Sequence, residues 1–375
     1  MKNTIYKYFF YEFLRFFLIT LFALAAIVWA VQSVNFLDLV TEDGHAFITY
    51  FKYSILTLSK VFTKLIPFSF LLAIVLTILK FEKDNELIVI WTSGLNKINV
   101  VNLILRISII IMFAQLLMTS FINPSLLNLS RSVLKSSELQ FIPSLMKEKE
   151  FNDTVEGLTI FIDKKDENNI YYNIFIQDDG RILSDVGTSS STIFARFGFI
   201  TPDEKNLILH DGNIQNLKDD NSVNIVKFYK TVFNLSGIST KSISEPKLQE
   251  TSTMKIIECI KNKYAEDFHN CKDNKKALMN IKIEINKRFG MPIFIPLISL
   301  ICSFLLSSRK DKKNYNYNKY IYFFICFAIL TLSEIMVRYS GNSWIHASTY
   351  YLLPLIMMPF FYLTLIRKFK YENLS

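Results

Sequence analysis

Glycine, histidine and cysteine are scarce in this sequence, and the motifs that depend on them are missing. The 375 residues include 10 glycines, 4 histidines and 4 cysteines. No Gly-Lys pair occurs, which excludes a P-loop, and neither HExxH nor GxSxG is present. The four histidines are scattered, so we expect no metal site and no bound cofactor. An active site of its own is therefore unsupported.

The cysteines divide into two kinds. Cys302 and Cys326 lie inside apolar runs, where we expect buried packing residues. Cys259 and Cys271 lie in a polar segment, and they could form a disulfide if that side of the membrane is oxidising. The sequence leaves this pairing open. The absence of a CxxC motif argues against a zinc or redox site.

The sequence is rich in long runs of apolar residues. Hydrophobic residues make up 51% of the chain, with 34 phenylalanines. A helix needs about 20 apolar residues to cross a bilayer. Six runs are long enough: Phe16–Val34, Leu65–Leu79 (with a start near Ser54), Asn99–Ile122, Phe289–Ser307, Tyr320–Val337 and Tyr350–Ile366. The first is too long for a cleaved signal peptide, and no small-residue cleavage site follows it.

The basic residues beside these runs predict an orientation. One set of short flanks contains Lys2, Lys7, Arg15, Lys80, Lys83, Lys97, Arg309, Lys310, Lys312, Lys313, Lys319, Arg367, Lys368 and Lys370. The opposite short flanks contain Lys52 and Arg338. Because basic loops stay in the cytoplasm, we expect both termini inside and the large polar block outside. The formal net charge of +9 is explained by these flanks, so we expect contact with membrane lipids and none with nucleic acid.

The polar block between the third and fourth runs reads as a β domain. Five segments carry β-branched and aromatic residues in rough alternation, separated by turn signals such as Asp-Asp-Gly. They are Leu158–Lys165, Ile170–Gly180, Ser191–Ile200, Asn206–Leu217 and Asn224–Leu235. From Ser252 to Arg288 the period becomes helical. The expected fold is six transmembrane helices plus an all-β, jelly-roll-like domain, with boundaries at 1–122, 123–288 and 289–375.

Charged residues inside the apolar runs are candidates for function. Lys60 and Lys64 share one helix face, with Lys52 two turns earlier, and Glu334 lies one turn before Arg338. Such charges usually face a cavity or a partner. The lysines either extend to the outer interface or line a path for an anionic cargo. Glu334 and Arg338 either serve that path or pair with each other.

A short amphipathic segment, "KDNELIVIWTSGLN" (Lys83–Asn96), lies between the second and third runs. Asp84 or Asn85 suits a helix N-cap, and Gly94 suits its end. Leu87, Ile90 and Trp91 would share an apolar face. Two readings remain open: a docking helix for a cytoplasmic partner, or a helix lying on the membrane surface.

Three stretches resemble one family, the lipopolysaccharide export permeases of the LptF/LptG (YjgP/YjgQ) type. They are "WAVQSVNFLDLV" (Trp29–Val40), "NELIVIWTSGLNKINV" (Asn85–Val100) and "IEINKRFGMPIFIPL" (Ile283–Leu297). The last contains Glu-x-x-x-Arg-x-x-x-Pro before the fourth span. The first and last stretches favour the F-type subunit. The resemblance covers almost the full length in the same order of spans and β domain.

The resemblance implies a bacterial inner-membrane subunit that works in an assembly. Such permeases pair with a sibling (LptG-like) and are driven by a cytoplasmic ATPase dimer (LptB-like), which uses the ATP. Lipopolysaccharide passes from the membrane through the periplasmic domain to a bridge protein (LptC/LptA-like). In this family the glutamate matching Glu86 pairs with a basic residue of the ATPase, so Glu86 is the first candidate for coupling.

The cargo is an amphiphile, which suggests candidate contacts. Lys52, Lys60 and Lys64 could contact the phosphates, and Phe36 and Leu37 could form an apolar wall. Ile160, Ile162, Ile174 and Ile176 could hold acyl chains, or they could be the ordinary core of the β domain. Two rival functions remain, the LptG-type sibling and a membrane-anchored envelope scaffold without transport.

Overall fold

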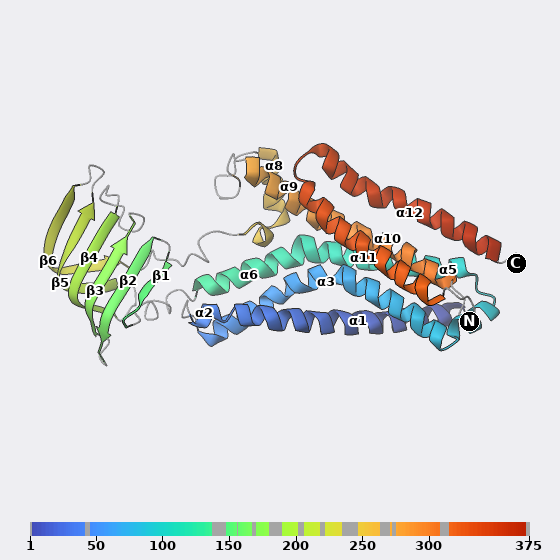
Figure 1. Ribbon diagram of the computed structural model, residues 1–375, viewed down its shortest axis with the longest axis horizontal. Coiled ribbons are helices and arrows are strands. Elements are labelled where there is room, and N and C mark those ends of the chain that lie inside the picture. The colour runs from blue at the N-terminus through green and yellow to red at the C-terminus, as the bar shows by residue number, and fades with distance from the viewer. Residues whose placement is uncertain are drawn as a thin grey trace. The chain divides into compact units, whose positions relative to one another are not determined.

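The computed structural model describes residues 2–41, 46–136, 148–155, 157–166, 170–179, 190–201, 206–217, 222–234, 247–262, 271, 275–307 and 315–372. They belong to two compact units (Figure 1). The first comprises Met1–Val31, Thr57–Asn128 and Lys247–Ser375, and the second comprises Gln32–Leu56 and Leu129–Pro246. The basic residues Arg309, Lys310, Lys312 and Lys313 lie outside the described residues.

The prediction of six membrane spans is confirmed for the part of the chain that is described. The spans are Thr4–Val40, Phe47–Lys83, Lys97–Lys135, Lys276–Ser307, Lys319–Tyr339 and Trp344–Lys370. The first runs from α1 (Lys2–Asn35) into the short helix α2 (Asp38–Thr41). The second, fifth and sixth lie on α3 (Phe47–Lys83), α11 (Tyr315–Tyr339) and α12 (Trp344–Glu372). Most extend beyond the apolar runs, because backbone hydrogen bonding continues into the polar flanks where hydropathy no longer marks the helix.

The third and fourth spans are interrupted helices. The third consists of α5 (Lys97–Leu117), a π-helical turn η1 (Met118–Ile122) and α6 (Asn123–Ser136). The fourth consists of α9 (Lys275–Gly290), the 3-10 turn η6 (Met291–Ile293), α10 (Phe294–Cys302) and the 3-10 turn η7 (Ser303–Ser307). Pro292 and Pro296 lack the N–H that regular α-helical bonding needs, which accounts for the tighter turn near α10.

The fourth span is the centre of the first unit. Every residue of α10 is buried, and it contacts α5, α11 and α12. Small side chains permit this close approach. The hydroxyl of Ser299 donates a hydrogen bond to that of Ser108 on α5 (3.1 Å), and the Sγ atoms of Cys302 and Cys326 lie 3.5 Å apart. Both cysteines are buried thiols, as the sequence predicts.

The segment that returns from the sheet to the membrane belongs to the first unit. It contains the 3-10 turn η4 (Leu248–Glu250), α8 (Thr253–Asn262) and α9, which contacts α11, α12 and η1. A disulfide joins Cys259 to Cys271, and both are buried beside Ile256 and Ile281. The predicted boundary at 288 therefore differs from the structure, because the return helices pack with the membrane helices.

The second unit contains a six-stranded antiparallel sheet whose strands pair in chain order. They are β1 (Phe151–Val155), β2 (Leu158–Lys165), β3 (Ile170–Asp178), β4 (Ser190–Ile200), β5 (Asn206–Leu217) and β6 (Val223–Asn234). The all-β prediction is confirmed, and five of the strands match the predicted segments closely. The sequence analysis missed β1, whose Asn-Asp pair has low β propensity.

One face of this sheet carries its hydrophobic core. In the pairing of β2 with β3, Ile160 lies opposite Ile176 and Ile162 opposite Ile174. All four are 0–2% exposed and pack with Leu207, Leu209 and Phe233. The alternation of apolar side chains along the strands thus correctly predicted that these four residues share one face. In this conformation they are core residues.

Gly290, at the end of α9, allows a close helix contact. A Cβ atom at this position would lie 2.1 Å from Cε1 of Tyr350, a fully buried ring on α12. We expect Gly290→Ala to lower the free energy of unfolding by about 1–3 kcal/mol, because the core has no room for the methyl group. Thermal unfolding in detergent measures this.

Thr349→Ala, at the exposed neighbour of Tyr350 on the same helix, is the matched control and should change little. Adding Tyr350→Leu to Gly290→Ala should recover part of the loss if the clash is its cause. An equal loss in both backgrounds would contradict the contact.

Candidate functional site

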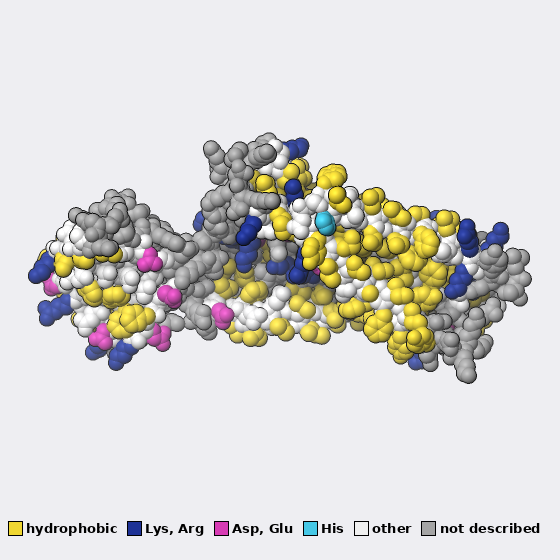
Figure 2. Space-filling model, turned by 45° about the horizontal axis from the view of Figure 1, so that its top comes forward, with side chains coloured by type: hydrophobic (Ala, Val, Ile, Leu, Met, Phe, Trp, Pro, Cys, Tyr) yellow, Lys and Arg dark blue, Asp and Glu magenta, His cyan; other side chains and the backbone are white. Residues whose placement is uncertain are grey.

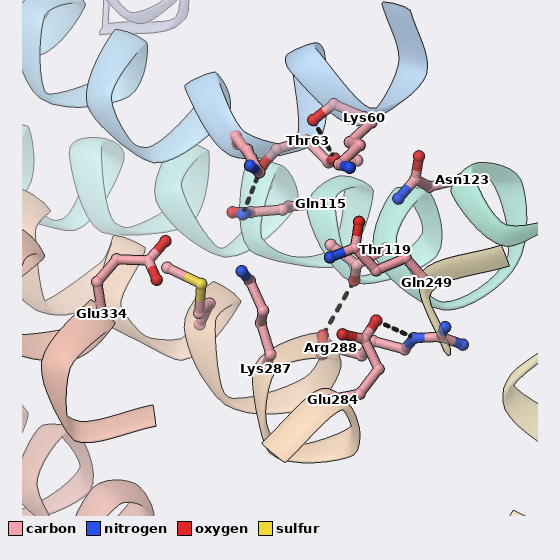
Figure 3. A pocket seen from close by; sticks show the side chains of 12 residues that line it. Lys60, Thr63, Gln115, Thr119, Asn123, Gln249, Glu284, Lys287, Arg288 and Glu334 are labelled. Atoms are coloured by element: carbon pink, nitrogen blue, oxygen red, sulfur yellow. Dashed lines mark hydrogen bonds and ion pairs between the residues drawn. The ribbon is translucent and has the colours of Figure 1, made fainter. Parts of the chain in front are cut away.

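A charged pocket opens between the helices of the first unit. Figure 2 shows dark-blue Lys and Arg side chains gathered around a hollow in the mostly apolar surface of the helices. The pocket holds about 560 Å³ of space, counting its open mouth. Its lining, much of it seen in Figure 3, is Lys60, Thr63, Lys64, Gln115, Thr119, Asn123, Gln249, Glu284, Lys287, Arg288, Met291 and Glu334.

One of the pocket's cations, Arg288, forms its hydrogen bonds and its ion pair within the protein. Arg288 is 3% exposed, and its guanidinium donates to Glu284 (3.0 Å) and to the hydroxyl of Thr253 (2.8 Å). It also donates to the backbone oxygens of Leu248 (3.1 Å) and Thr251 (3.0 Å). A buried guanidinium is tolerated when its donors are satisfied in this way. Arg288 therefore fixes the return segment against α9.

The same network reaches the third span at its π-helical turn. Thr119 donates to the backbone oxygen of Arg288 (3.0 Å), and Thr253 donates to the backbone oxygen of Ser120. A π-turn frees backbone groups from regular α-helical bonding. Here the backbone oxygen of one of its residues, Ser120, accepts a bond from outside the helix, so η1, α8 and α9 are joined around one guanidinium.

The other pocket charges are not paired within the described residues. Lys60 and Lys64 come from α3, Lys287 from α9 and Glu334 from α11, and no ion pair joins any of them to a described residue. Glu284 is already paired with Arg288. The pocket therefore presents three lysines against one carboxylate, an arrangement that attracts anions.

The structure brings together some of the predicted residues and separates others. Lys60, Lys64 and Glu334 line the pocket, whereas Arg338 is exposed and forms no ion pair with Glu334 among the described residues. The remaining candidates belong to the second unit. There Lys52 and Leu37 are exposed, and the ring of Phe36 packs on that of Tyr53 with centroids 5.1 Å apart.

Sequence reasoning missed Lys287 and Gln115. Lys287 precedes Arg288, the arginine of the Glu-x-x-x-Arg motif. A charged residue at the start of the fourth span is a signal that could have marked it as a candidate. Gln115 is a lone amide inside the apolar run of the third span, which is a signal of the same kind as an intramembrane charge.

The amphipathic segment forms the predicted short helix, α4 (Glu86–Thr92). Asn85 occupies the N-cap position with φ 59°, without a side-chain capping hydrogen bond, so the predicted cap does not form. Gly94 ends the helix as predicted, with φ 82° and its N–H donating to the backbone oxygen of Trp91 (3.1 Å).

The predicted apolar face of α4 is buried within the chain. Leu87 and Ile90 are each only 6% exposed and belong to the core of the first unit, with Trp91 packed against that core. They are therefore not the exposed surface that a docking partner needs. The exposed apolar residues of α4 are Ile88 and Val89, at 59% and 66% exposure. The apolar face was read correctly, but it anchors the helix to its own chain.

Glu86 lies in a network of charges at the same end of the helices. The hydroxyl of Tyr8 on α1 donates to Oε1 of Glu86 (3.1 Å), and Oε2 is buried without a hydrogen-bond partner among the described residues. Nearby along α3, Lys80 pairs with Glu12 (2.7 Å) and Glu82 lies 3.8 Å from Lys319. Glu86 is thus partly engaged by its own chain, which the sequence did not indicate.

Comparison with known proteins decides the family. The family model described as "Lipopolysaccharide export system permease LptF/LptG" matches residues 7–368. The chain belongs to the LptF/LptG family. The match reaches into all six spans and includes the sheet, and it does not separate LptF from LptG. LptF/LptG proteins are permease components of a transporter, so this chain is a multi-pass protein of the inner membrane.

One relative extends the comparison without adding a function. An uncharacterised protein of Rickettsia prowazekii (strain Madrid E) is 31% identical over 177 residues, which is 46% of this chain and 48% of the relative. The match thus spans about half of each protein. The LptF/LptG assignment rests on the family model.

Removing the guanidinium should be costly in this LptF/LptG chain. We expect Arg288→Met to lower the free energy of unfolding by about 3–5 kcal/mol, because Glu284 and two backbone oxygens lose their buried donor. Thermal unfolding in detergent and limited proteolysis between residues 247 and 253 measure this. Lys287→Met, at the adjacent unpaired cation, is the control, and an equal loss there would contradict the assignment.

Proposed function

We propose that this chain is an F-type permease subunit of an ATP-driven exporter, which takes lipopolysaccharide from the inner membrane toward a periplasmic bridge protein. The observation that carries the proposal is the pocket with three unpaired lysines between the membrane helices of an LptF/LptG chain. Within the family the cargo is lipopolysaccharide, whose lipid A carries phosphates.

The pocket suits a phosphorylated amphiphile on physical grounds. A charge within a membrane span is costly, up to about 2.5–3.5 kcal/mol at mid-bilayer on insertion scales, so lysines without an ion pair favour an anionic ligand. Phosphate supplies it, because lysine binds phosphate as a compact charge with three donors. Lys60, Lys64 and Lys287 are proposed to hold the phosphates while the acyl chains stay on apolar helix surface.

The orientation follows from two features. The basic flanks favour both termini in the cytoplasm and the sheet in the periplasm. The disulfide between Cys259 and Cys271 supports this, because disulfides persist in oxidising compartments such as the periplasm. Both features favour a cargo path from the membrane toward the periplasmic sheet.

The motor is proposed to be a separate ATPase dimer that docks on α4, with a second permease of the family completing the assembly. The exposed Ile88 and Val89 offer an apolar contact, and Glu86 at the start of the same helix is proposed to turn toward a basic residue of the motor when it docks, because its Oε2 has no hydrogen-bond partner among the described residues. A helix seated on its own core through Leu87 and Ile90 can transmit movement to α3 and α5, which flank it in the chain.

The sheet is proposed to receive the acyl chains on the face of Ile160, Ile162, Ile174 and Ile176. Because these side chains are buried against one another and against other residues of the sheet, this role requires that face of the sheet to open. A G-type subunit would use the same elements and is the nearest alternative. A scaffold without transport would leave the unpaired lysines unexplained.

Reversing the pocket charge tests the transport role. We expect the double substitution Lys60→Glu and Lys287→Glu to reduce arrival of lipopolysaccharide at the cell surface at least tenfold, because phosphate would meet carboxylates in place of ammonium groups. Lys255→Glu, at an exposed residue of α8, is the control for one such charge reversal outside the pocket. Normal export by a stably expressed double variant would refute the pocket as the cargo site.

Changing the exposed face of α4 tests the motor contact. We expect Ile88→Asp with Val89→Asp to reduce co-purification of the ATPase at least tenfold, because a buried apolar contact would receive two charges. Ile225→Asp, at a similarly exposed residue of the sheet, should leave the ATPase bound. Undiminished co-purification by a folded double variant would move the docking surface elsewhere.

A further inference from the structure

The pocket contains an acceptor that its lysines do not explain. Gln115 is 2% exposed, and its Nε2 donates to the backbone oxygen of Thr63 (3.4 Å). A carbonyl oxygen can only accept, so this bond fixes the amide with Oε1 as the other atom. Oε1 is buried and has no partner among the described residues. A buried acceptor without a donor is costly, which points to a ligand that donates a hydrogen bond here.

A second acceptor enters the same space from α11. Figure 3 shows the carboxylate of Glu334 directed into the pocket, on the side of Gln115 and Lys287. In a pocket for anions alone this carboxylate would weaken binding by repulsion, and a neutral residue would serve better. The carboxylate of Glu334 would strengthen binding if part of the ligand is positively charged.

We infer that the pocket takes a head group bearing both a phosphate and a primary ammonium, with the lysines on the phosphate and Glu334 and Gln115 on the ammonium. An ammonium has three donors and no acceptor, so it can satisfy a carboxylate and an amide oxygen together. This inference is based on which helices supply each kind of group. The cations come from α3 and α9, and the acceptors come from α5 and α11. This inference deepens the proposed function and rests on it for the cargo.

Two sources carry this chemistry. One is lipopolysaccharide whose lipid A phosphate bears an amine substituent, and the other is a zwitterionic phospholipid of the bilayer. Both present a phosphate and an ammonium within one head group. An experiment with matched pairs of lipids separates them.

The test is native mass spectrometry of the purified full-length chain in detergent, with two competitions. The first offers phosphatidylethanolamine and phosphatidylglycerol with the same acyl chains, and the second offers lipid A with and without phosphoethanolamine on one phosphate. We expect the native chain to prefer the amine-bearing member of at least one pair about tenfold, as for a charge-assisted hydrogen bond.

Glu334→Gln should remove that preference by weakening the amine-bearing lipid and strengthening the plain anion. Gln115→Met, which replaces the amide by a side chain of similar size, should reduce the preference in part. Glu258→Gln, at an exposed residue of α8, changes the same charge outside the pocket and should leave the preference intact. Unchanged thermal unfolding establishes that the variants are folded.

The outcomes separate this inference from the proposed function. Lipid A bound equally with and without the amine, and phospholipids without preference, would overturn the inference and leave the proposed cargo standing. An amine preference among phospholipids with no binding of lipid A would support the inference and count against the cargo. If Glu334→Gln strengthens both members of a pair by the same factor, the carboxylate only balances the lysines and the inference fails.

Discussion

The fold of the first unit depends on one buried cation. Arg288 satisfies a carboxylate, a hydroxyl and two backbone oxygens, and its own backbone oxygen accepts a bond from the third span. Without those partners a guanidinium would be too costly to bury at this helix end. With them, the returning chain, the fourth span and the π-turn are held in one arrangement, and the neighbouring Lys287 is left to face the pocket.

The elements that follow from hydrophobic runs and from the spacing of apolar residues were predictable from the sequence. Six apolar runs gave six spans, and alternation placed Ile160, Ile162, Ile174 and Ile176 on one sheet face. Gly94 marked the end of α4 because a left-handed residue is needed there. These features are local, and a window of a few residues contains the information that determines them.

The features that the sequence could not reveal depend on long-range packing. Nothing near Leu87 or Ile90 says whether their apolar face meets the chain's own core or a partner. The hydroxyl of Tyr8 meets Glu86 across 78 positions. Lys60, Lys287 and Glu334 come from three spans, so only the packing of α3, α9 and α11 makes them one site. Glu334 and Arg338 are one turn apart, yet Glu334 lines the pocket, Arg338 is exposed, and no ion pair joins them among the described residues.

The π-turn in the third span has a consequence for helical phase. An α-helix advances 3.6 residues per turn, so each residue is rotated about 100° from the one before it. A π-turn accommodates one additional residue as a local bulge, and α6 therefore starts out of phase with a simple continuation of α5. Relaxing Met118–Ile122 to regular α-helix would rotate the whole face of α6, including Asn123, around its axis without lengthening the span by more than a residue. The helical phase of α6 is thus set by the π-turn beside the pocket, and the bonds that Thr119 and Ser120 make to their neighbours stabilise that phase.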